Sequence, residues 1–372
     1  MIKEHLPKVI AWETTRRCVL RCKHCRGSAR DENYAGELST EECLRVIDSI
    51  AAFAKPILIL TGGEPMARDD IYDLARHATD AGLRVVMAPC GHLITPETAR
   101  KLKAAGVMAI SISIDGATPE AHDAFRGVEG AYARTIEGLQ HAIAAGIPFQ
   151  INTTVTRDNV DALPAIHDLA VGLGASKFDV FFLVPTGRGS ALRDLALSPT
   201  EAEDALRWVL EKSKTSPMSV KITCAPHSVR IWDQMGEGPA ATSGGGGHPG
   251  SIPEGHPGGA GGGRPQMSPA TGCMAGDGFV FISHTGVLQP CGFLDVASGD
   301  LRRVDFDFQR AYRESAVFAS LWDKSGYEGK CGVCEFVDSC GGCRARAYAK
   351  TGDHLKAEPG CSYVPAALDK RS

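Results

Sequence analysis

The chain has 372 residues, of which 43% are hydrophobic, enough to bury a large core and to form two domains. Its formal net charge of −4 argues against a nucleic-acid-binding protein, so we expect no nucleic-acid partner. No apolar run approaches the length of a membrane span, and the first residues lead into no apolar signal segment, so we expect a cytoplasmic protein with no membrane span.

Strands alternate with helices over residues 8–215. Short apolar runs predict strands at 9–13, 57–60, 85–88, 107–114, 148–154 and 178–184. The spacing of apolar residues predicts helices that begin near Ser39 and at 69–82, 96–105, 132–145, 161–172 and 199–214. Six such units indicate an α/β fold with a parallel barrel or part of one, in which chemistry gathers at the carboxyl ends of the strands.

The composition changes in the connector over residues 216–272. Within it, Gly and Pro are too dense in the segment 236–268 to bury a core, so we expect a flexible linker there. The His-Pro-Gly repeats at 248–250 and 256–258 leave weak binding of metal or haem as an alternative.

Residues 273–372 form a shorter, cysteine-rich third region. Alternating residues and the turn at Thr285-Gly286 predict a β-hairpin over 278–289, and a helix is expected at 305–324. The remainder, from Cys331 to Cys361, is expected to be a compact metal-binding tail. The chain has 13 cysteines, mostly in short-spaced groups, which favours metal ligation over disulfides in a reducing compartment.

Three of these cysteines, Cys18, Cys22 and Cys25, follow the first predicted strand in a Cys-x3-Cys-x2-Cys spacing. Three thiolates can hold three corners of a [4Fe–4S] cube, which leaves the fourth iron free to bind a small molecule. A zinc site that uses His24 or a remote fourth ligand is the alternative.

This spacing resembles the radical S-adenosylmethionine (SAM) superfamily. The resemblance implies that the open iron chelates the amino and carboxyl groups of SAM. An electron from the cluster then splits SAM into methionine and a 5′-deoxyadenosyl radical, which abstracts a hydrogen atom. The superfamily usually has a partial (β/α)6 TIM-type barrel, which agrees with the six predicted units.

Four further features match SAM-binding positions of the superfamily. The turn Gly62-Gly63-Glu64-Pro65, directly after a strand, corresponds to a turn that contacts the amino group of SAM; an ordinary strand-to-helix turn is the alternative. Ser113 and Asp115 lie on one face of a strand end, where polar groups contact the ribose and carboxylate, although Asp115 could instead cap the next helix. Arg126 resembles an arginine that pairs with the SAM carboxylate, unless it is a surface residue. His24 replaces an aromatic residue near adenine.

The later cysteines resemble the SPASM (or twitch) domain, a small C-terminal domain with two auxiliary [4Fe–4S] clusters. The resemblance assigns Cys331, Cys334, Cys340 and Cys361 to the distal cluster, and Cys273, Cys291 and Cys343 to the proximal one, although Cys340 and Cys343 are one residue closer than usual. Cys224 or His227 could complete the proximal set or bind substrate. Structural zinc in the tail is the alternative. Of the remaining cysteines, Cys43 is expected in the core and Cys90 near the pocket without a clear role.

Several strings narrow the resemblance to the haem-forming branch of the superfamily; they lie at 10–18, 24–26, 223–227, 278–284 and 289–292. Members of this branch decarboxylate iron-coproporphyrin III, make haem d1 or process didecarboxysiroheme. The first activity converts two propionates to vinyls. Hydrogen abstraction from the propionate β-carbon and loss of CO2 leave one electron, for which an auxiliary cluster is an acceptor. A peptide-modifying SPASM maturase is the alternative; such enzymes commonly carry an extra N-terminal domain, whereas here the barrel is expected to start near Met1.

The resemblance implies an iron-porphyrin substrate and a reducing electron donor such as flavodoxin or ferredoxin, and we expect a monomer. Propionates need fixed cations, because a buried carboxylate without a partner is costly. The candidates near the expected barrel mouth are Arg17, Arg21, Arg26 and Arg188, with ordinary surface charge as the alternative for each.

Overall fold

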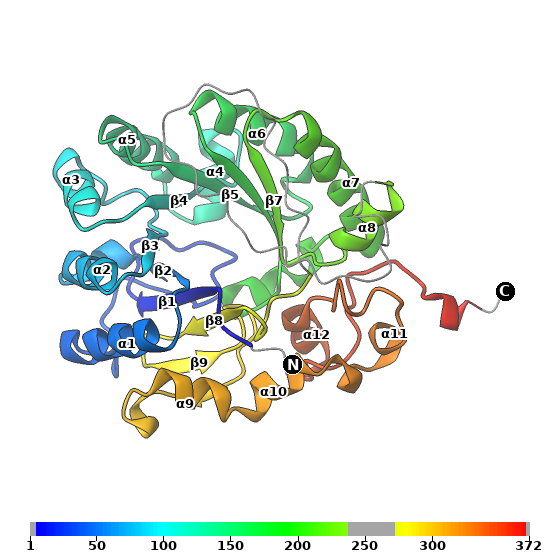
Figure 1. Cartoon of the computed structure of the whole chain (residues 1–372). Helices are drawn as coiled ribbons and strands as arrows, with labels where there is room; N and C mark the ends of the chain where they lie inside the picture. The colour runs from blue at the N-terminus through cyan, green and yellow to red at the C-terminus, as the bar shows by residue number, and fades with distance from the viewer. Residues whose placement is uncertain (1–4, 237–271, 370–372) are drawn as a thin grey trace.

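Ten strands form one sheet in the computed structural model, which describes residues 5–236 and 272–369 (Figure 1). Strands β1 to β7 pair in parallel and in chain order, and their order in the sheet is β10-β9-β8-β1-β2-β3-β4-β5-β6-β7. The strands are β1 (Val9–Thr15), β2 (Ile57–Gly62), β3 (Arg84–Met87), β4 (Ala109–Ser113), β5 (Phe149–Val155), β6 (Lys177–Phe182), β7 (Ser219–Thr223), β8 (Phe279–Ile282), β9 (Val287–Gln289) and β10 (Gly299–Asp300). The predicted α/β fold with parallel strands is confirmed.

Helices between the strands cover the outer side of this sheet, as Figure 1 shows. In α1, Ser39 and Glu42 form a capping box, and Cys43, Val46 and Ile50 are buried against the sheet, which confirms that Cys43 is a core residue. The helices of this layer are α1 (Thr40–Phe53), α2 (Ile71–Asp80), α3 (Pro96–Ala104), α4 (Pro119–Arg126), α5 (Ala131–Ala144), α6 (Leu163–Gly172) and α7 (Pro199–Thr215). None of the helices in the described ranges is long and apolar enough to cross a membrane.

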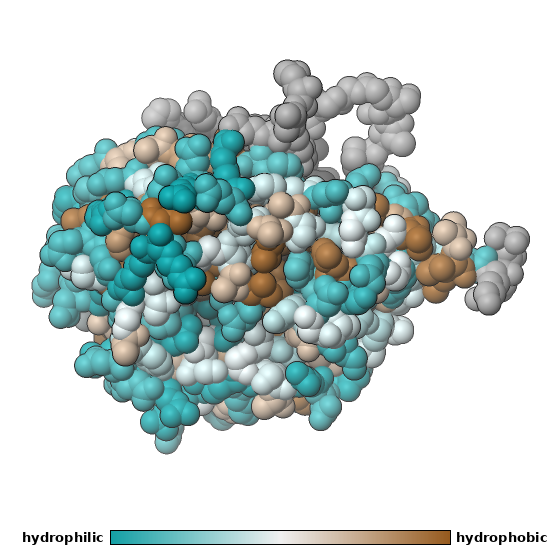
Figure 2. Space-filling view, turned by 90° about the horizontal axis from the view of Figure 1, so that it is seen from below, coloured by the Kyte–Doolittle hydropathy of each residue, from teal (hydrophilic) through white to brown (hydrophobic). Residues whose placement is uncertain are grey.

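The C-terminal region adds short helices to one end of the sheet (Figure 1). The helix predicted at 305–324 is two helices, because Ser315 caps a new one. The short helices are α8 (Ser228–Gln234), α9 (Phe308–Arg313), α10 (Ala316–Trp322), α11 (Gly329–Gly332) and α12 (Arg344–Thr351). Figure 2 shows a mostly hydrophilic face with separate apolar groups, some of them beside the C-terminal end, where Val364 and Leu368 are exposed.

The sheet is longer at both ends than the predicted six units. Strand β7 was not predicted; it lies in the predicted connector, and only Val220 and Ile222 mark its buried face. Strand β8, from the predicted hairpin, pairs in parallel with β1, so the sheet includes a piece of the predicted third region. The domain limits at 215 and 272 stay a prediction. The predicted linker 236–268 lies outside the described residues except for Gly236.

Candidate functional site: three groups of cysteines

The first group of cysteines lies on the loop that follows β1, at the carboxyl end of the parallel strands. We call residues 16–30 the cluster loop. The Cys18 and Cys22 side chains are buried and that of Cys25 is partly exposed, and the three pack in one small apolar cluster. The structure therefore brings together the three thiols that the sequence predicted as ligands.

Each of these sulfurs accepts a hydrogen bond. The Leu20 and Ala29 amides donate to the sulfurs of Cys18 and Cys25, both at 3.4 Å, and the Arg126 guanidinium donates to Cys22 at 3.5 Å. Burial raises the pKa of Cys18 to about 12, so ligation requires a metal to displace the thiol proton. Donors aimed at sulfur are the surroundings that thiolate ligands of an iron–sulfur cluster need, and the loop fits such a cluster.

The predicted Gly62–Pro65 turn packs closely against the backbone at the start of the cluster loop. A Cβ on Gly62 would lie 2.2 Å from the Thr15 carbonyl oxygen, and one on Gly63 would lie 2.4 Å from that of Arg16, so a side chain would fit at neither position. The Gly63 amide donates to the Thr15 oxygen at 2.8 Å. These contacts hold the turn against the residues immediately before Cys18.

The carboxylate of Glu64 is fully buried and has partners of its own. Its oxygens accept hydrogen bonds from the amides of Met66 (3.0 Å) and Cys90 (2.6 Å). Cys90 also packs against the apolar cluster of the three thiols, which places it beside the predicted pocket. In this structure Glu64 therefore orders the turn, and its expected contact with the SAM amino group stays a prediction.

Asp115, just after β4, and Arg126, at the end of α4, form a buried ion pair. The other Asp115 oxygen accepts from the Thr154 amide at 2.7 Å. The alternative that Asp115 caps the following helix is wrong, because Thr118 caps α4. Arg126 is buried and not a surface residue, and it connects Asp115 to the sulfur of Cys22. Ser113 ends β4 and is partly buried; whether these groups contact SAM stays a prediction.

Arg188 holds the cluster loop through hydrogen bonds to its main-chain carbonyl oxygens. It lies in η3 (Gly187–Leu195), after β6, and its guanidinium donates to the carbonyl oxygens of Cys22 (3.0 Å) and Ala29 (2.6 Å). Its amide donates to the Cys25 oxygen at 3.0 Å. The alternative of ordinary surface charge is therefore wrong for Arg188. The hydrogen bonds of Arg188 hold the backbone of the cluster loop in place.

The His24 residue of the cluster loop is partly buried. Its ring stacks on Phe125, with the ring centroids 4.6 Å apart and an interplanar angle of 18°. Burial, with Arg126 and Arg188 nearby, lowers the pKa of His24 well below its usual value, so the ring is neutral. Its Nδ1 has no hydrogen-bond partner among the described residues.

A buried carboxylate that the sequence analysis missed, Glu13, lies between the cluster loop and the β8–β9 hairpin. Its oxygens pair with Arg16 (3.0 Å), Arg26 (3.4 Å) and His284 (2.9 Å). Burial alone would raise the pKa of Glu13, but Arg26, His284 and Arg16 together lower it to about 2. Two permanent cations therefore share one carboxylate. The sequence signal for Glu13 was a charged residue that directly follows four apolar residues in a predicted strand.

The guanidinium of Arg26 faces the C-terminal region. It lies 4.0 Å from the centre of the Phe281 ring, and a Cβ on Gly292 would lie 3.4 Å from its Nε. Arg26 also lowers the pKa of Cys291, which burial raises to about 11. Arg26 thus lies between the cluster loop and the second group of cysteines.

The second group contains Cys224, Cys273, Cys291 and Cys343. Cys224 follows the end of β7 in a left-handed conformation (φ +64°) and packs with Cys291 and Cys343 in one apolar cluster. Burial and then the neighbouring thiols of Cys343 and Cys291 raise the pKa of Cys224, and Cys273 contributes as well. The structure therefore brings Cys224 together with the cysteines of the predicted proximal set, and its role as a ligand stays a prediction.

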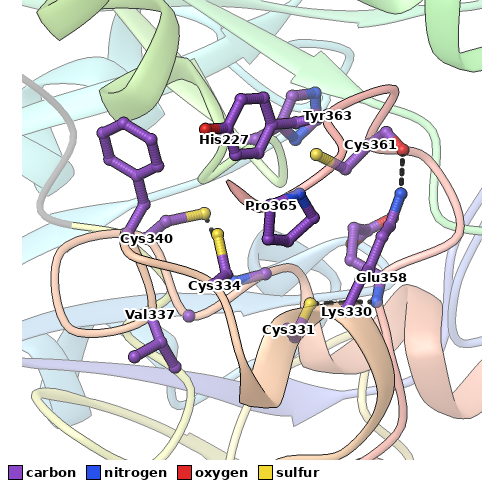
Figure 3. A pocket seen from close by; sticks show the side chains of 13 residues that line it. His227, Lys330, Cys331, Cys334, Val337, Cys340, Glu358, Cys361, Tyr363 and Pro365 are labelled. Atoms are coloured by element: carbon purple, nitrogen blue, oxygen red, sulfur yellow. Dashed lines mark hydrogen bonds between the residues drawn. The ribbon is translucent and has the colours of Figure 1, made fainter. Parts of the chain in front are cut away.

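The third group lines a pocket that is partly open to solvent, shown in Figure 3. Its walls include all the cysteines of the predicted distal set, and His227 and Tyr363 also line it; the cysteines are Cys331, Cys334, Cys340 and Cys361. Four cysteines around one pocket fit a four-iron cube, which takes one thiolate for each iron. The choice between an iron–sulfur cluster and zinc at these cysteines stays a prediction.

Two salt-bridged residues connect the second and third groups. Glu358 is fully buried and accepts from the Cys343 amide at 2.7 Å, while its own amide donates to the Cys331 sulfur at 3.3 Å. Arg346 pairs with Glu358 at 3.1 Å and donates to the Cys224 carbonyl oxygen at 2.8 Å. The sequence analysis missed both residues, and no spacing in the sequence marks them.

Comparisons with known proteins agree with this arrangement. The family model described as "Radical SAM superfamily" matches residues 12–170. The chain is 47% identical to an AdoMet-dependent haem synthase of Nitratidesulfovibrio vulgaris, over 97% of this chain and 94% of that protein. It is 45% identical to an AdoMet-dependent haem synthase of Methanosarcina barkeri, over 96% of this chain and 97% of that protein.

Among solved structures, Streptococcus suis SuiB bound to S-adenosylmethionine is similar with a TM-score of 0.71. That match covers 96% of this chain and 78% of SuiB at 14% sequence identity, which makes it a likeness of fold.

Proposed function

The chain belongs to the family of AdoMet-dependent haem synthases within the radical SAM superfamily, and from this premise we propose that it converts two propionates of iron-coproporphyrin III to vinyls to give haem b. The observation that carries this proposal is the high identity to a haem synthase over nearly the whole of both chains. The cysteine loop at the carboxyl end of the sheet agrees with it.

The residues of the cluster loop hold the SAM-cleaving centre. Cys18, Cys22 and Cys25 bind three irons of a [4Fe–4S] cluster, and Arg126 and Arg188 keep the loop in place through the Cys22 sulfur and carbonyl oxygen. When bound, this cluster supplies the electron that cleaves SAM, and auxiliary clusters accept the electron that is left when CO2 is lost.

Two auxiliary [4Fe–4S] clusters are part of the proposal. The distal one takes the cysteines that line the cavity in Figure 3. The proximal one takes Cys273, Cys291 and Cys343, with Cys224 as its fourth ligand. The support for Cys224 is its packing against Cys291 and Cys343, and its carbonyl oxygen is fixed by Arg346.

Arg26 is the candidate partner for a propionate. Arg188 uses its guanidinium on two main-chain carbonyls, and Arg17 pairs with Asp31 at the surface at 2.6 Å. Arg21 is exposed, with no side-chain partner among the bonds of the described residues. Arg26 lies beside an aromatic ring between two groups of cysteines, and the carboxylate with which it pairs, that of Glu13, is shared with another arginine. This combination suits a flat apolar substrate that carries carboxylates.

An anaerobic assay tests the reaction. Purified protein with reconstituted iron and sulfide is mixed with dithionite, SAM and iron-coproporphyrin III, and the products are read by mass spectrometry. We expect loss of two CO2 per porphyrin and one 5′-deoxyadenosine for each CO2. A protein that cleaves SAM but leaves this porphyrin unchanged would contradict the proposal.

A spectroscopic titration tests Arg26. In Arg26→Ala, iron-coproporphyrin III should bind more weakly by about 1.5–3 kcal/mol, the range for hydrogen bonds to charged groups. Arg17→Ala is the matched control and should bind normally, because its partner is a surface aspartate. Equal binding by both variants would remove Arg26 from the site.

We further propose that the protein works in the cytoplasm as a monomer and receives electrons from a flavodoxin or ferredoxin. The support is the haem-forming resemblance. Size-exclusion chromatography with light scattering tests the monomer. Replacement of dithionite by reduced flavodoxin or ferredoxin in the assay tests the donor.

A further inference from the structure

His227 is a buried histidine whose ring the proposed reaction does not use. It follows β7 by four residues and begins α8, and its side chain is 3% exposed. Neither ring nitrogen has a hydrogen-bond partner among the described residues. Leaving a buried polar group without a partner is unfavourable, so this position calls for an explanation.

The charged neighbours of His227 do not supply the missing partner. Arg230 pairs with Glu203 at 2.8 Å, and Arg346 pairs with Glu358 at 3.1 Å. These charged groups therefore pair with one another, and none of them forms a hydrogen bond with the His227 ring.

The space that His227 does face is the cavity of the distal cysteines. His227 lines this cavity together with all of the distal cysteines, and Figure 3 shows it beside Tyr363 and Cys361. The Tyr363 hydroxyl is already engaged with Glu335. His227 is thus a polar group at this wall with an unused donor, and the sulfurs of an iron–sulfur cluster are hydrogen-bond acceptors.

We propose that His227 donates a hydrogen bond to a sulfur of the distal cluster and thereby raises the reduction potential of that cluster. This inference rests on the proposed function, which assigns an iron–sulfur cluster to the cavity. The reduced cluster carries one more negative charge than the oxidised cluster, so a donor at its sulfur stabilises the reduced form more. His227 is a positioning residue in this role, since Cys331, Cys334, Cys340 and Cys361 already provide one thiolate for each iron.

An electron paramagnetic resonance redox titration tests this role in the full-length chain. The parent is the Cys18→Ala protein, in which the auxiliary clusters alone remain to be titrated. In His227→Phe on this parent, we expect a more negative midpoint potential for one auxiliary cluster and no change for the other. His227→Gln keeps a donor and should recover part of the shift. Tyr363→Phe is the control: it alters the same wall but removes a hydroxyl engaged elsewhere, so both potentials should stay unchanged.

The iron content makes the result decisive. An unchanged potential in fully iron-loaded His227→Phe would overturn the hydrogen bond and leave the proposed function intact. A loss of about four irons per chain in that variant would also overturn it, because His227 would then be needed to hold the cluster itself. Zinc in the tail of the parent protein would overturn the cluster assignment in the proposed function together with this inference.

Discussion

The cluster loop and the cysteine-rich tail hold thiols in different ways. In the loop, three ligands come from eight consecutive residues, and groups on α4, on η3 and in the Gly62–Pro65 turn hold the backbone. In the tail, the cysteines that line one pocket are spread over residues 331–361, and the fully buried side chains include the charged Arg344 and Glu358. The loop is thus an attachment to a completed core, whereas in the tail the proposed clusters are themselves much of the core.

The largest expected effect separates the two regions directly. Cys18→Ala, Cys22→Ala or Cys25→Ala should abolish SAM cleavage and lower the iron content from about twelve to about eight per chain, since one four-iron cube is lost. The thermal unfolding midpoint should change little. The measurements are 5′-deoxyadenosine by chromatography and iron by mass spectrometry. Normal 5′-deoxyadenosine from any of these variants would refute the assignment.

In the tail, the same type of change should affect structure as well. Cys331→Ala or Cys340→Ala should lose about four irons per chain and expose residues 329–361 to limited proteolysis, because a cluster that binds only the folded state contributes to its stability. Cys43→Ala is the matched control, as Cys43 is fully buried in α1 and belongs to no group of ligands. If the tail resists protease as well without iron as with it, the contrast between the regions fails.

Low pH should lower the stability contributed by Glu13, which lies between the cluster loop and the C-terminal region. The pKa of Glu13 is lowered from 4.5 to about 2, so its stabilisation is complete above about pH 4.5 and is lost as the pH falls towards 2. This shift corresponds to about 3 kcal/mol. Denaturant unfolding between pH 5 and pH 2 should show a loss of this order in the wild type. Glu13→Gln should be less stable at pH 5 and should lack this component of the pH dependence.

The smallest expected effect concerns the close contact between Gly63 and the backbone of the cluster loop. Gly63→Ala places a methyl group about 2.4 Å from a carbonyl oxygen of the cluster loop and should cost about 1–3 kcal/mol of unfolding free energy, as overpacking does. It should also lower the iron content of the loop. Gly172→Ala is the control, because its Cβ meets nothing within 4 Å and it lies in α6. Equal stability of the two variants would contradict the close contact.

The sequence predicted the alternation of strands and helices, because each buried element repeats apolar residues at its own period. It missed β7, whose buried face has only two apolar residues, Val220 and Ile222. It also did not indicate that β8 joins β1, because a strand of four residues carries no signal about which strand it will pair with.

The short spacing of Cys18, Cys22 and Cys25 predicted the first group, since ligands close in sequence must be close in space. The other two groups were assigned by the resemblance to the SPASM domain, with Cys224 left open. It could not predict the role of Arg188, whose guanidinium bonds to main-chain carbonyls that every residue possesses. The partners of Glu64 were hidden for the same reason, as both are backbone amides. A hydrogen bond from a side chain to the backbone places no requirement on the residue type of its partner, so the sequence does not reveal it.

The pairing of β1 with β8 has a consequence for the synthesis of the chain. Val9 lies opposite Phe279, so one edge of β1 has to wait for a strand that leaves the ribosome much later. At a usual elongation rate of 5–20 residues per second, this delay lasts on the order of 10–50 s. During this interval the nascent barrel presents an open, apolar strand edge of the kind that pairs with other chains. A fragment that stops before residue 279 would keep that edge for its lifetime and should aggregate, whereas the complete chain closes it with its own hairpin.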